Sequence, residues 1–251
     1  MTTDELVVDV SQDWISASHV QQRFMRGPDG ISGSMDYSAQ CRQIRSLGGD
    51  CYDFTPLPDN KVALCVGDAC GKGLAAALMI ANVQSSLKTA ALFTGAELAT
   101  LIEIVNCQTY YSTPEDRYAT LFYGVLDRAN RRLRYVNAGH NPPLVIHRNR
   151  SIAQLETGGP PVGMFPGARY EESSVQLEAG DLLIAYTDGI IEATNLLGEE
   201  WGVEGLLGAA VQGWKDSPDA ADLINVIFSA LDEFSTNRQT DDATLAVVRV
   251  I

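Results

Sequence analysis

The alternation of apolar and polar residues changes its period several times along the chain, and each change predicts a new element. A helical period, with Ala17, Val20 and Phe24 on one face, predicts a helix over residues 12–25. The Gly27-Pro28-Asp29-Gly30 run predicts the end of that helix, because glycine and proline interrupt helical backbone. The chain is therefore expected to begin with one amphipathic helix followed by a turn.

A two-residue period replaces the helical one after this turn. It predicts strands over residues 35–43, 52–57 and 62–66. Pro58-Asp59-Asn60 stands between the last two strands and is typical of a tight turn. We therefore expect these two strands to form a hairpin.

Two helices and a run of short strands are predicted next. Alanine- and leucine-rich patterns predict helices over residues 74–93 and 96–111. Five apolar runs, each bounded by turn residues, predict strands that we expect to form one antiparallel sheet. These runs cover residues 118–126, 133–137, 144–147, 172–177 and 182–186.

The end of the chain returns to helical spacing. Helices are predicted over residues 203–213 and 219–234, and a closing strand over residues 244–250. Strands mixed with paired helices predict an α+β fold built of packed layers. The 251 residues are 45% hydrophobic and 20% charged, as in a typical globular protein, and no repeat or proline-, glycine- or serine-rich stretch divides them.

Net charge and cysteine content narrow the classes of function. A net charge of −14 opposes binding to nucleic acid or to an anionic membrane, so we expect neither partner. The five cysteines are odd in number and show no C-x-x-C pairing, which favours reduced thiols and implies no zinc site. The amino terminus lacks a signal-peptide pattern and no apolar run is long enough to cross a bilayer, so we expect a cytoplasmic protein.

Four aspartates are placed so that folding can bring them together. Asp50 and Asp68 are equidistant from Asp59 in the predicted turn, so the hairpin sets them opposite each other. Asp188 follows the strand over 182–186, and Asp241 precedes the last strand; they meet at one edge if those strands are antiparallel neighbours. Oxygen ligands without histidine or cysteine suit magnesium or manganese. The alternative is that all are turn and strand-end aspartates, which are common.

Five short motifs rich in glycine and aspartate contain these residues. They are Gly48-Gly49-Asp50-Cys51-Tyr52-Asp53, Gly67-Asp68-Ala69-Cys70-Gly71-Lys72-Gly73, Asn137-Ala138-Gly139-His140-Asn141-Pro142-Pro143, Thr187-Asp188-Gly189 and Asp241-Asp242-Ala243-Thr244-Leu245. In content and order they resemble the SpoIIE-type, RsbU-like branch of the PPM metal-dependent serine/threonine phosphatases. The resemblance covers residues 36–251, nearly the whole chain.

The resemblance implies an α-β-β-α sandwich, in which two antiparallel sheets are flanked by helices, with a two-metal centre at one edge. The positions that match its metal ligands are Asp50, Asp68, Ala69 (through the main-chain carbonyl), Asp188 and Asp241. We expect Asp68 to be shared by both ions, and Asp242 to support the ligands without binding metal.

The implied activity is hydrolysis of phosphoserine or phosphothreonine on another protein, without a phosphoenzyme. Two Mn²⁺ or Mg²⁺ ions about 3.5 to 4 Å apart bridge a water, lower its pKa and neutralise the phosphate oxygens. The cations also remove a conflict, because a phosphoserine carries roughly −1.5 to −2 charges and is repelled by an acidic protein. The implied substrate is a small anti-anti-sigma-type regulator in a partner-switching circuit.

The match departs from the eukaryotic relatives at one position. Cys70 stands where they have a histidine that protonates the leaving oxygen, so the general acid is unassigned. His140 is a candidate for that role, with a structural role in its turn as the alternative. Arg45, and Arg42 before it, are candidates to bind the phosphate, with solvated surface charges as the alternative.

Residues 1–30 resemble the linker helix that joins sensory domains to the phosphatase in this branch and can dimerise and switch it. The phosphatase domain then covers residues 31–251. Either the protein works without a covalent sensor or the chain is an excised domain. A homodimer contact and plain packing of the helix both remain open, because a short apolar stripe cannot distinguish them.

Two rival functions are distinguishable. Gly48-Gly49-Asp50 resembles the hairpin of diguanylate cyclases, but Cys51 and Tyr52 follow it instead of an acidic residue and a phenylalanine. That interpretation also leaves Asp188 without a role. The other rival is a catalytically weak, phosphatase-like module that binds a partner; the four matched aspartates argue against it and Cys70 argues for it.

Overall fold

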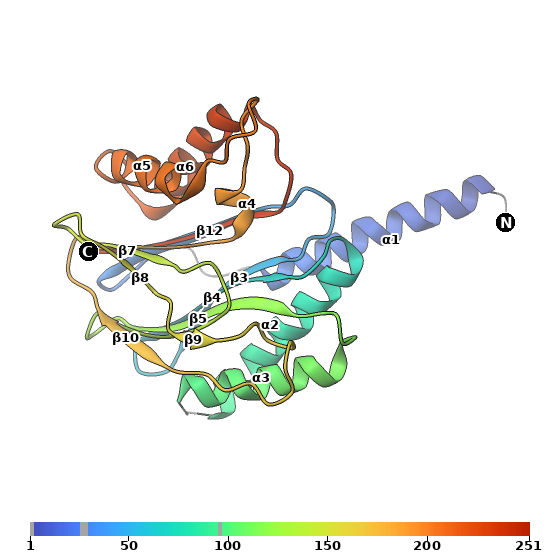
Figure 1. Ribbon diagram of the computed structural model, residues 1–251, viewed down its shortest axis with the longest axis horizontal. Helices are drawn as coiled ribbons and strands as arrows, with labels where there is room; N and C mark the ends of the chain where they lie inside the picture. Colours follow the sequence, from blue (N-terminus) through green and yellow to red (C-terminus); the bar gives the residue numbers. More distant parts are fainter. Residues whose placement is uncertain (1–2, 26–29, 95–96) are drawn as a thin grey trace.

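Two six-stranded sheets face each other, and helices cover their outer faces. The computed structural model describes residues 3–25, 30–94 and 97–251. Figure 1 shows α5 and α6 on one side of the sheet pair and α2 and α3 on the other. The expected α-β-β-α sandwich is confirmed. In the part of the chain that is described, every helix is too short or too polar to cross a lipid bilayer.

The first sheet, called sheet 1 here, joins strands from both ends of the chain. Its order is β1 (Gly30–Ser32), β2 (Met35–Arg42), β12 (Ala243–Val250), β11 (Leu182–Tyr186), β7 (Leu144–Ile146) and β8 (Ile152–Gln154). All neighbouring pairs are antiparallel. The predicted neighbour relation between the strands over 182–186 and 244–250 is therefore confirmed.

The second sheet, sheet 2, is formed by the middle of the chain. Its order is β10 (Ser173–Gln176), β6 (Arg132–Ala138), β5 (Ala119–Asp127), β4 (Lys61–Ala69) and β3 (Asp50–Leu57), with β9 (Gly158–Gly159) parallel to β6. The predicted hairpin is confirmed as β3 and β4. Three residues, Pro58, Asp59 and Asn60, separate the last paired residues Leu57 and Lys61, and Asp59 and Asn60 both have positive φ.

The helices pack in pairs. On sheet 2 lie α2 (Leu74–Thr94) and α3 (Leu98–Ser112), and on sheet 1 lie α5 (Gly202–Trp214) and α6 (Ala220–Ser235). The short α4 (Asp188–Ile191) follows β11 directly. In Figure 1, α1 (Thr3–Phe24) extends away from the layers toward the amino terminus.

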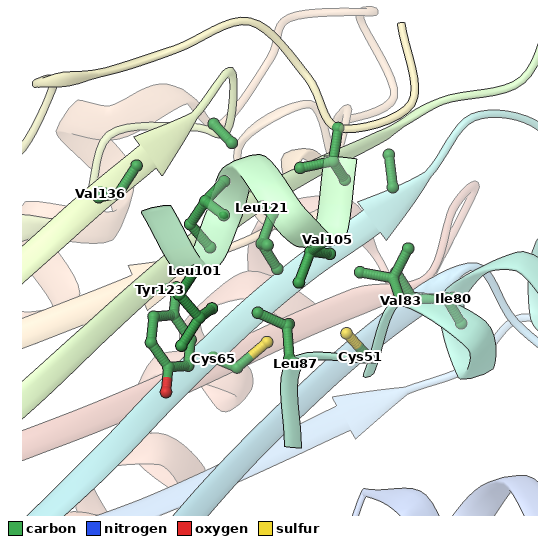
Figure 2. Packing of buried hydrophobic residues seen from close by; sticks show 14 of the residues in the cluster. Cys51, Cys65, Ile80, Val83, Leu87, Leu101, Val105, Leu121, Tyr123 and Val136 are labelled. Atoms are coloured by element: carbon green, nitrogen blue, oxygen red, sulfur yellow. The ribbon is translucent and has the colours of Figure 1, made fainter. Parts of the chain in front are cut away.

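Three apolar clusters hold the layers together. One fills the space between the sheets with side chains such as Phe54 and Phe122. Another packs sheet 2 against α2 and α3, and Figure 2 shows Val83, Val105 and Leu121 inside it. The third packs sheet 1 against α5 and α6. Because both faces of each sheet are covered, the central strands are nearly continuous apolar runs without strict alternation.

The expectation that the five strands between residues 118 and 186 form one sheet is wrong. Strands β5, β6 and β10 belong to sheet 2, whereas β7 and β11 belong to sheet 1. The chain crosses between the sheets after β6, where Gly139 adopts a positive φ. Strand spacing predicts the strands themselves, but their partners are distant in sequence, as in the pairing of β11 with β12.

The first helix also differs from its prediction. It begins at Thr3, well before residue 12. Val20, placed by the pattern on the packed face, is 58% exposed, whereas Gln21 is buried. Gln21 is buried because its side-chain amide is hydrogen-bonded to the backbone of the chain before β3, a partner that periodicity does not reveal. The predicted stop over residues 27–29 lies outside the described residues.

Candidate metal centre

The hairpin places the first two aspartates directly opposite each other. Asp50 begins β3, Asp68 lies near the end of β4, and the two are partners in the strand register. Asp50 is 1% exposed, and Asp68 is partly exposed. Two carboxylates thus share one end of sheet 2, as the symmetry about Asp59 predicted.

Thr187, between β11 and α4, and Thr244 of β12 hold Asp50. The hydroxyls of Thr187 and Thr244 donate to Asp50 Oδ2 at 2.7 and 2.6 Å. The backbone N–H of Thr244 donates to Thr187 Oγ1 at 2.9 Å, which fixes the two threonines to each other. This network crosses from sheet 1 to sheet 2, so it brings the residue after Thr187 to the edge where Asp50 lies.

Asp188 and the Asp241-Asp242 pair meet at this edge because β11 and β12 are antiparallel neighbours. Asp188 begins α4, and Asp241 and Asp242 immediately precede β12. A Cβ on Gly189 would collide with the backbone carbonyl of Asp242, so the close approach of the two segments depends on glycine at that position.

The electrostatics of the edge reflect this convergence. Burial, and after it the carboxylates of Asp50, Asp188, Asp241 and Asp242, raise the pKa of Asp68 to about 8. Burial also raises the pKa of Asp50 to about 7, against the lowering effect of its two threonine hydrogen bonds. The pKa of Asp188 is raised by burial and then by Asp241. Like charges gathered at one buried edge favour either bound protons or a bound cation.

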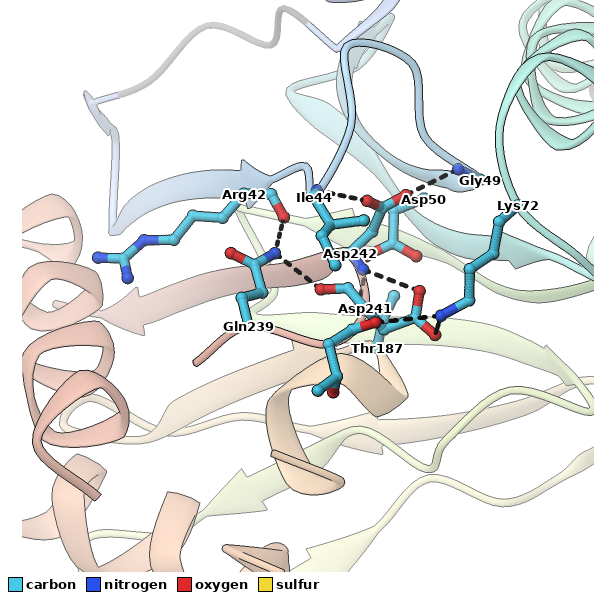
Figure 3. Close-up of polar contacts among 10 residues, drawn as sticks. Arg42, Ile44, Gly49, Asp50, Lys72, Thr187, Gln239, Asp241 and Asp242 are labelled. Atoms are coloured by element: carbon cyan, nitrogen blue, oxygen red, sulfur yellow. Dashed lines mark hydrogen bonds and ion pairs between the residues drawn. The ribbon is translucent and has the colours of Figure 1, made fainter. Parts of the chain in front are cut away.

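A lysine lies among these carboxylates. Lys72 Nζ lies 2.6 Å from Asp241 Oδ2 and donates to the carbonyl of Thr240 at 3.1 Å. Figure 3 shows this ion pair beside Thr187 and Asp242. Within the described ranges, no three histidine, cysteine, aspartate or glutamate side chains are arranged so that together they could hold one metal ion. The aspartates therefore share an edge, while Asp241 is directed to Lys72.

The donor set at this edge nevertheless has the chemistry that a hard divalent cation requires. A Cβ on Gly49 would lie 3.0 Å from the carbonyl oxygen of Ala69 and 3.2 Å from Asp68 Oδ1. The missing side chain therefore leaves a space faced by a main-chain oxygen and a carboxylate oxygen. Oxygen donors alone, four of them from carboxylates, suit Mg²⁺ or Mn²⁺.

Asp242 has a different position from the other aspartates. Its Oδ1 accepts the backbone N–H of Ile44 at 2.8 Å, and its Oδ2 accepts that of Gly49 at 2.9 Å (Figure 3). A Cβ on Gly48 would collide with the same carboxylate. Asp242 therefore holds the loop that leads into Asp50.

Helix α1 contacts the same loop. Gln21 Nε2 donates to the carbonyl of Gly48 at 2.7 Å, and the N–H of Gly48 donates to Gln21 Oε1 at 3.1 Å. Sequence reasoning missed Gln21, Thr187, Thr244 and Lys72 as parts of this site. Thr187, Thr244 and Lys72 lie inside the five motifs, so their closeness in sequence to an aspartate could have identified them. No feature of the sequence marks Gln21.

His140 lies inside the protein near this edge. Its Nδ1 is 2.8 Å from the hydroxyl of Thr120, the residue that pairs with Asp68 in the sheet. Its backbone N–H donates to Asn137 Oδ1 at 2.7 Å, and Asn137 Nδ2 donates back to its carbonyl. Burial lowers the pKa of His140 to about 4, so the imidazole is neutral at pH 7. These contacts favour a structural role for His140.

The two candidate arginines are in different situations. Arg42 Nη1 lies 2.8 Å from both carboxylate oxygens of Asp232, and its guanidinium stacks 4.0 Å from the ring centre of Phe228. It therefore joins β2 to α6. Arg45 is exposed, and its Nη1 would lie 3.5 Å from a Cβ on Gly73, beside the loop that contains Lys72. Of the two, only Arg45 remains available to a phosphate.

A protein-family model matches most of the chain. The family model described as "Stage II sporulation protein E (SpoIIE)" matches residues 58–251. That range includes Asp68, Asp188 and Asp241 but begins after Asp50, so it is shorter at its amino end than the range that the motifs indicated.

Individual proteins are similar over most of the chain. Protein IcfG of Synechocystis sp. is 29% identical over 233 residues, which are 81% of this chain and 36% of IcfG. The phosphoserine phosphatase RsbU of Bacillus subtilis is 22% identical over 93% of this chain and 68% of RsbU. The chain thus spans about a third of one relative and about two thirds of the other.

Among solved structures, the SiaA-PP2C domain of Pseudomonas aeruginosa superimposes with a TM-score of 0.81. The match covers 100% of both chains at 16% sequence identity. At this identity the similarity shows the shared fold.

Proposed function

The chain belongs to the SpoIIE family, and on that premise we propose that it is a metal-dependent protein phosphatase that hydrolyses phosphoserine or phosphothreonine on a regulatory protein. One observation carries the proposal: Asp50, Asp68 and Asp188, far apart in sequence, lie at one edge with Asp241, and burial together with neighbouring carboxylates raises the pKa of each of the three. RsbU, a relative of the chain, is named a phosphoserine phosphatase.

We assign Asp50, Asp68, Asp188, Asp241 and the carbonyl of Ala69 as the groups that would hold two Mn²⁺ or Mg²⁺ ions. When bound, such ions supply positive charge for the phosphate oxygens and lower the pKa of a water between them. Thr187 and Thr244 both bind Asp50 Oδ2, so they orient the carboxylate and leave Oδ1 for a cation. The raised pKa of Asp68 means that cation binding releases a proton there.

Two residues have proposed roles outside the ligand set. Arg45, exposed beside the Lys72 loop, is placed to bind a substrate phosphate. His140 holds its turn and orients Thr120 beside Asp68, a positioning role that its burial supports over proton donation.

The first helix is proposed to act as a switch element, with a homodimer as one way to move it. Its support is the pair of hydrogen bonds between Gln21 and Gly48, which link α1 to the loop before Asp50. The proposed substrate is a phosphorylated anti-anti-sigma-type regulator, and the proposed compartment is the cytoplasm, consistent with five free cysteines.

The test of the activity is release of phosphate from p-nitrophenyl phosphate and from a phosphoserine peptide, with Mn²⁺, with Mg²⁺ and with EDTA. We expect release that needs the divalent ion and is lost in Asp68→Asn. Absence of release with every divalent ion overturns the proposal. Incubation with candidate phosphorylated regulators then identifies the protein substrate by loss of its phosphate.

A second candidate function is a phosphatase-like module that binds a partner with little catalysis. The ion pair between Lys72 and Asp241 favours it, because it engages one of the matched carboxylates. The same experiment separates the two: binding of a phosphorylated regulator without release of its phosphate supports the module.

A further inference from the structure

The turn that follows α4 presents two leucines to solvent. Leu196 is 65% exposed and Leu197 is 82% exposed, and no other large apolar side chain of the described residues is more exposed than Leu197. Exposed apolar area of this kind is unfavourable in water, so covering these leucines with a partner is favourable. The two adjacent leucines therefore form a small apolar surface that the described residues leave uncovered.

This turn is well ordered, so its leucines are held outward by structure. The Asn195 side-chain oxygen accepts the backbone N–H groups of Leu197 at 2.9 Å and Glu199 at 3.0 Å, and its Nδ2 donates to the Glu199 carboxylate at 2.8 Å. At the base of the turn, the N–H of Trp201 donates to the carbonyl of Ala193 at 2.9 Å. An ordered turn that exposes leucines loses little conformational entropy when a partner covers it.

The base of the turn lies close to the aspartate edge. Helix α4 begins at Asp188, and the N–H of Glu192 donates to the Asp188 carbonyl at 2.8 Å. The pKa of Glu192 is raised by burial and then by Asp188, Glu200 and Asp241, so both sides of the turn are within electrostatic reach of the edge. Leu196 and Leu197 stand three and four residues beyond Ala193 at the base, so they lie at most about 14 Å from it.

Because the base of the turn lies beside the aspartates, one protein–protein contact can include both the aspartates and the turn. A standard interface covers about 800 Å² on each partner. A protein whose phosphoserine reaches the aspartate edge would therefore also cover the turn, whereas a small aryl phosphate would not. Glu199 and Glu200, two and three residues after Leu197, are exposed and make the border of the contact negative. Its complement is an apolar socket bordered by lysine or arginine.

We propose that the Leu196-Leu197 turn is the docking element for the protein substrate of this site, and that the substrate receives it in an apolar socket flanked by basic side chains. The inference rests on the proposed phosphatase function. It assigns the turn to recognition of the protein, and the aspartate edge to the phosphate.

The test compares the double variant Leu196→Ser/Leu197→Ser with the unsubstituted protein on two probes, a phosphorylated anti-anti-sigma-type regulator and p-nitrophenyl phosphate. We expect the ratio of kcat/KM for the regulator to that for the aryl phosphate to fall about tenfold or more, mainly through KM, because interface leucines act in binding. The matched control is Leu92→Ser on α2, a leucine that is 69% exposed. It lies 18 residues along the helix from Leu74, roughly 27 Å from the end beside the Lys72 loop.

A calorimetric Kd for the phosphorylated regulator, measured on an Asp68→Asn background, reports docking without turnover. A rise in Kd in the turn variant alone supports the inference even if no phosphate is released, in which case only the proposed activity fails. An unchanged ratio and Kd, or an equal change in Leu92→Ser, overturns it. Loss of a dimer in the turn variant, seen by light scattering, also overturns it by making a second copy the occupant.

Discussion

Strand β11 has an aspartate at each end, and the two illustrate opposite uses of a buried carboxylate. Asp181, just before the strand, is 2% exposed and accepts N–H groups from Arg148, from Glu178 and from the imidazole of His147 at 2.9–3.0 Å. Asp188, just after the strand, faces Asp241 and other carboxylates, and its pKa is raised. A carboxylate surrounded by donors stabilises the fold, whereas carboxylates that face each other leave a charge for a ligand to neutralise.

Asp68→Asn should have the largest effect of these substitutions, because it should lower the activity and raise the stability of the metal-free protein. We expect phosphate release to fall by at least about a hundredfold. In metal-free buffer near pH 8 the free energy of unfolding should rise, because the substitution removes a carboxylate whose pKa burial and its neighbours raise to about 8. Thermal unfolding in EDTA measures the second effect, and lower stability of the variant would contradict it.

The buried imidazole of His140 should make the free energy of unfolding depend on pH. Its folded pKa of about 4 lies below its ordinary value of 6.5, so the neutral imidazole stabilises the fold above pH 6.5. This stabilisation should be lost as pH falls from 6.5 toward 4, by about 3 kcal/mol at most. We expect the free energy of unfolding of the unsubstituted protein, measured against that of His140→Gln in EDTA, to decline over this window. The comparison with His140→Gln is needed because the aspartates with raised pKa values stabilise the metal-free fold as the pH falls. A flat difference would contradict the prediction.

Asp181→Asn is the converse of Asp68→Asn. It removes a charge that three N–H donors satisfy, so we expect the free energy of unfolding to fall by about 1–3 kcal/mol. The kcat/KM for p-nitrophenyl phosphate at a temperature well below unfolding should stay within about twofold. Urea denaturation and the aryl phosphate assay measure the two quantities; a large loss of activity in the folded variant would mean that the two ends of β11 are coupled.

Lys72→Met should have the smallest effect. The ammonium pairs with Asp241 at 2.6 Å and so competes with a cation for that carboxylate. A partly exposed ion pair contributes about 1 kcal/mol or less, so we expect up to about fivefold tighter Mn²⁺ binding in calorimetry of the folded protein. Lys72→Arg, which keeps the charge, should remain close to the unsubstituted protein. Weaker Mn²⁺ binding in Lys72→Met would indicate that Lys72 supports the cation site.

Local sequence patterns located most of the elements and the part of the site that lies on the hairpin. Alternation and turn residues located the hairpin, and the symmetry of Asp50 and Asp68 about Asp59 set their register, because a hairpin pairs residues equidistant from its turn. Motif order identified the family, since five spaced motifs are far more specific than any single one.

The sheet that each strand joins and the groups that surround the aspartates depend on how the layers pack. The threonines on Asp50, the lysine on Asp241 and the contact of Gln21 with Gly48 each join residues more than 25 positions apart. Such contacts depend on how the layers pack, and packing free energy is shared among many residues that local periodicity does not connect. The chemistry of the carboxylates could thus be read along the chain, whereas their surroundings, which set their pKa values, exist only in the folded protein.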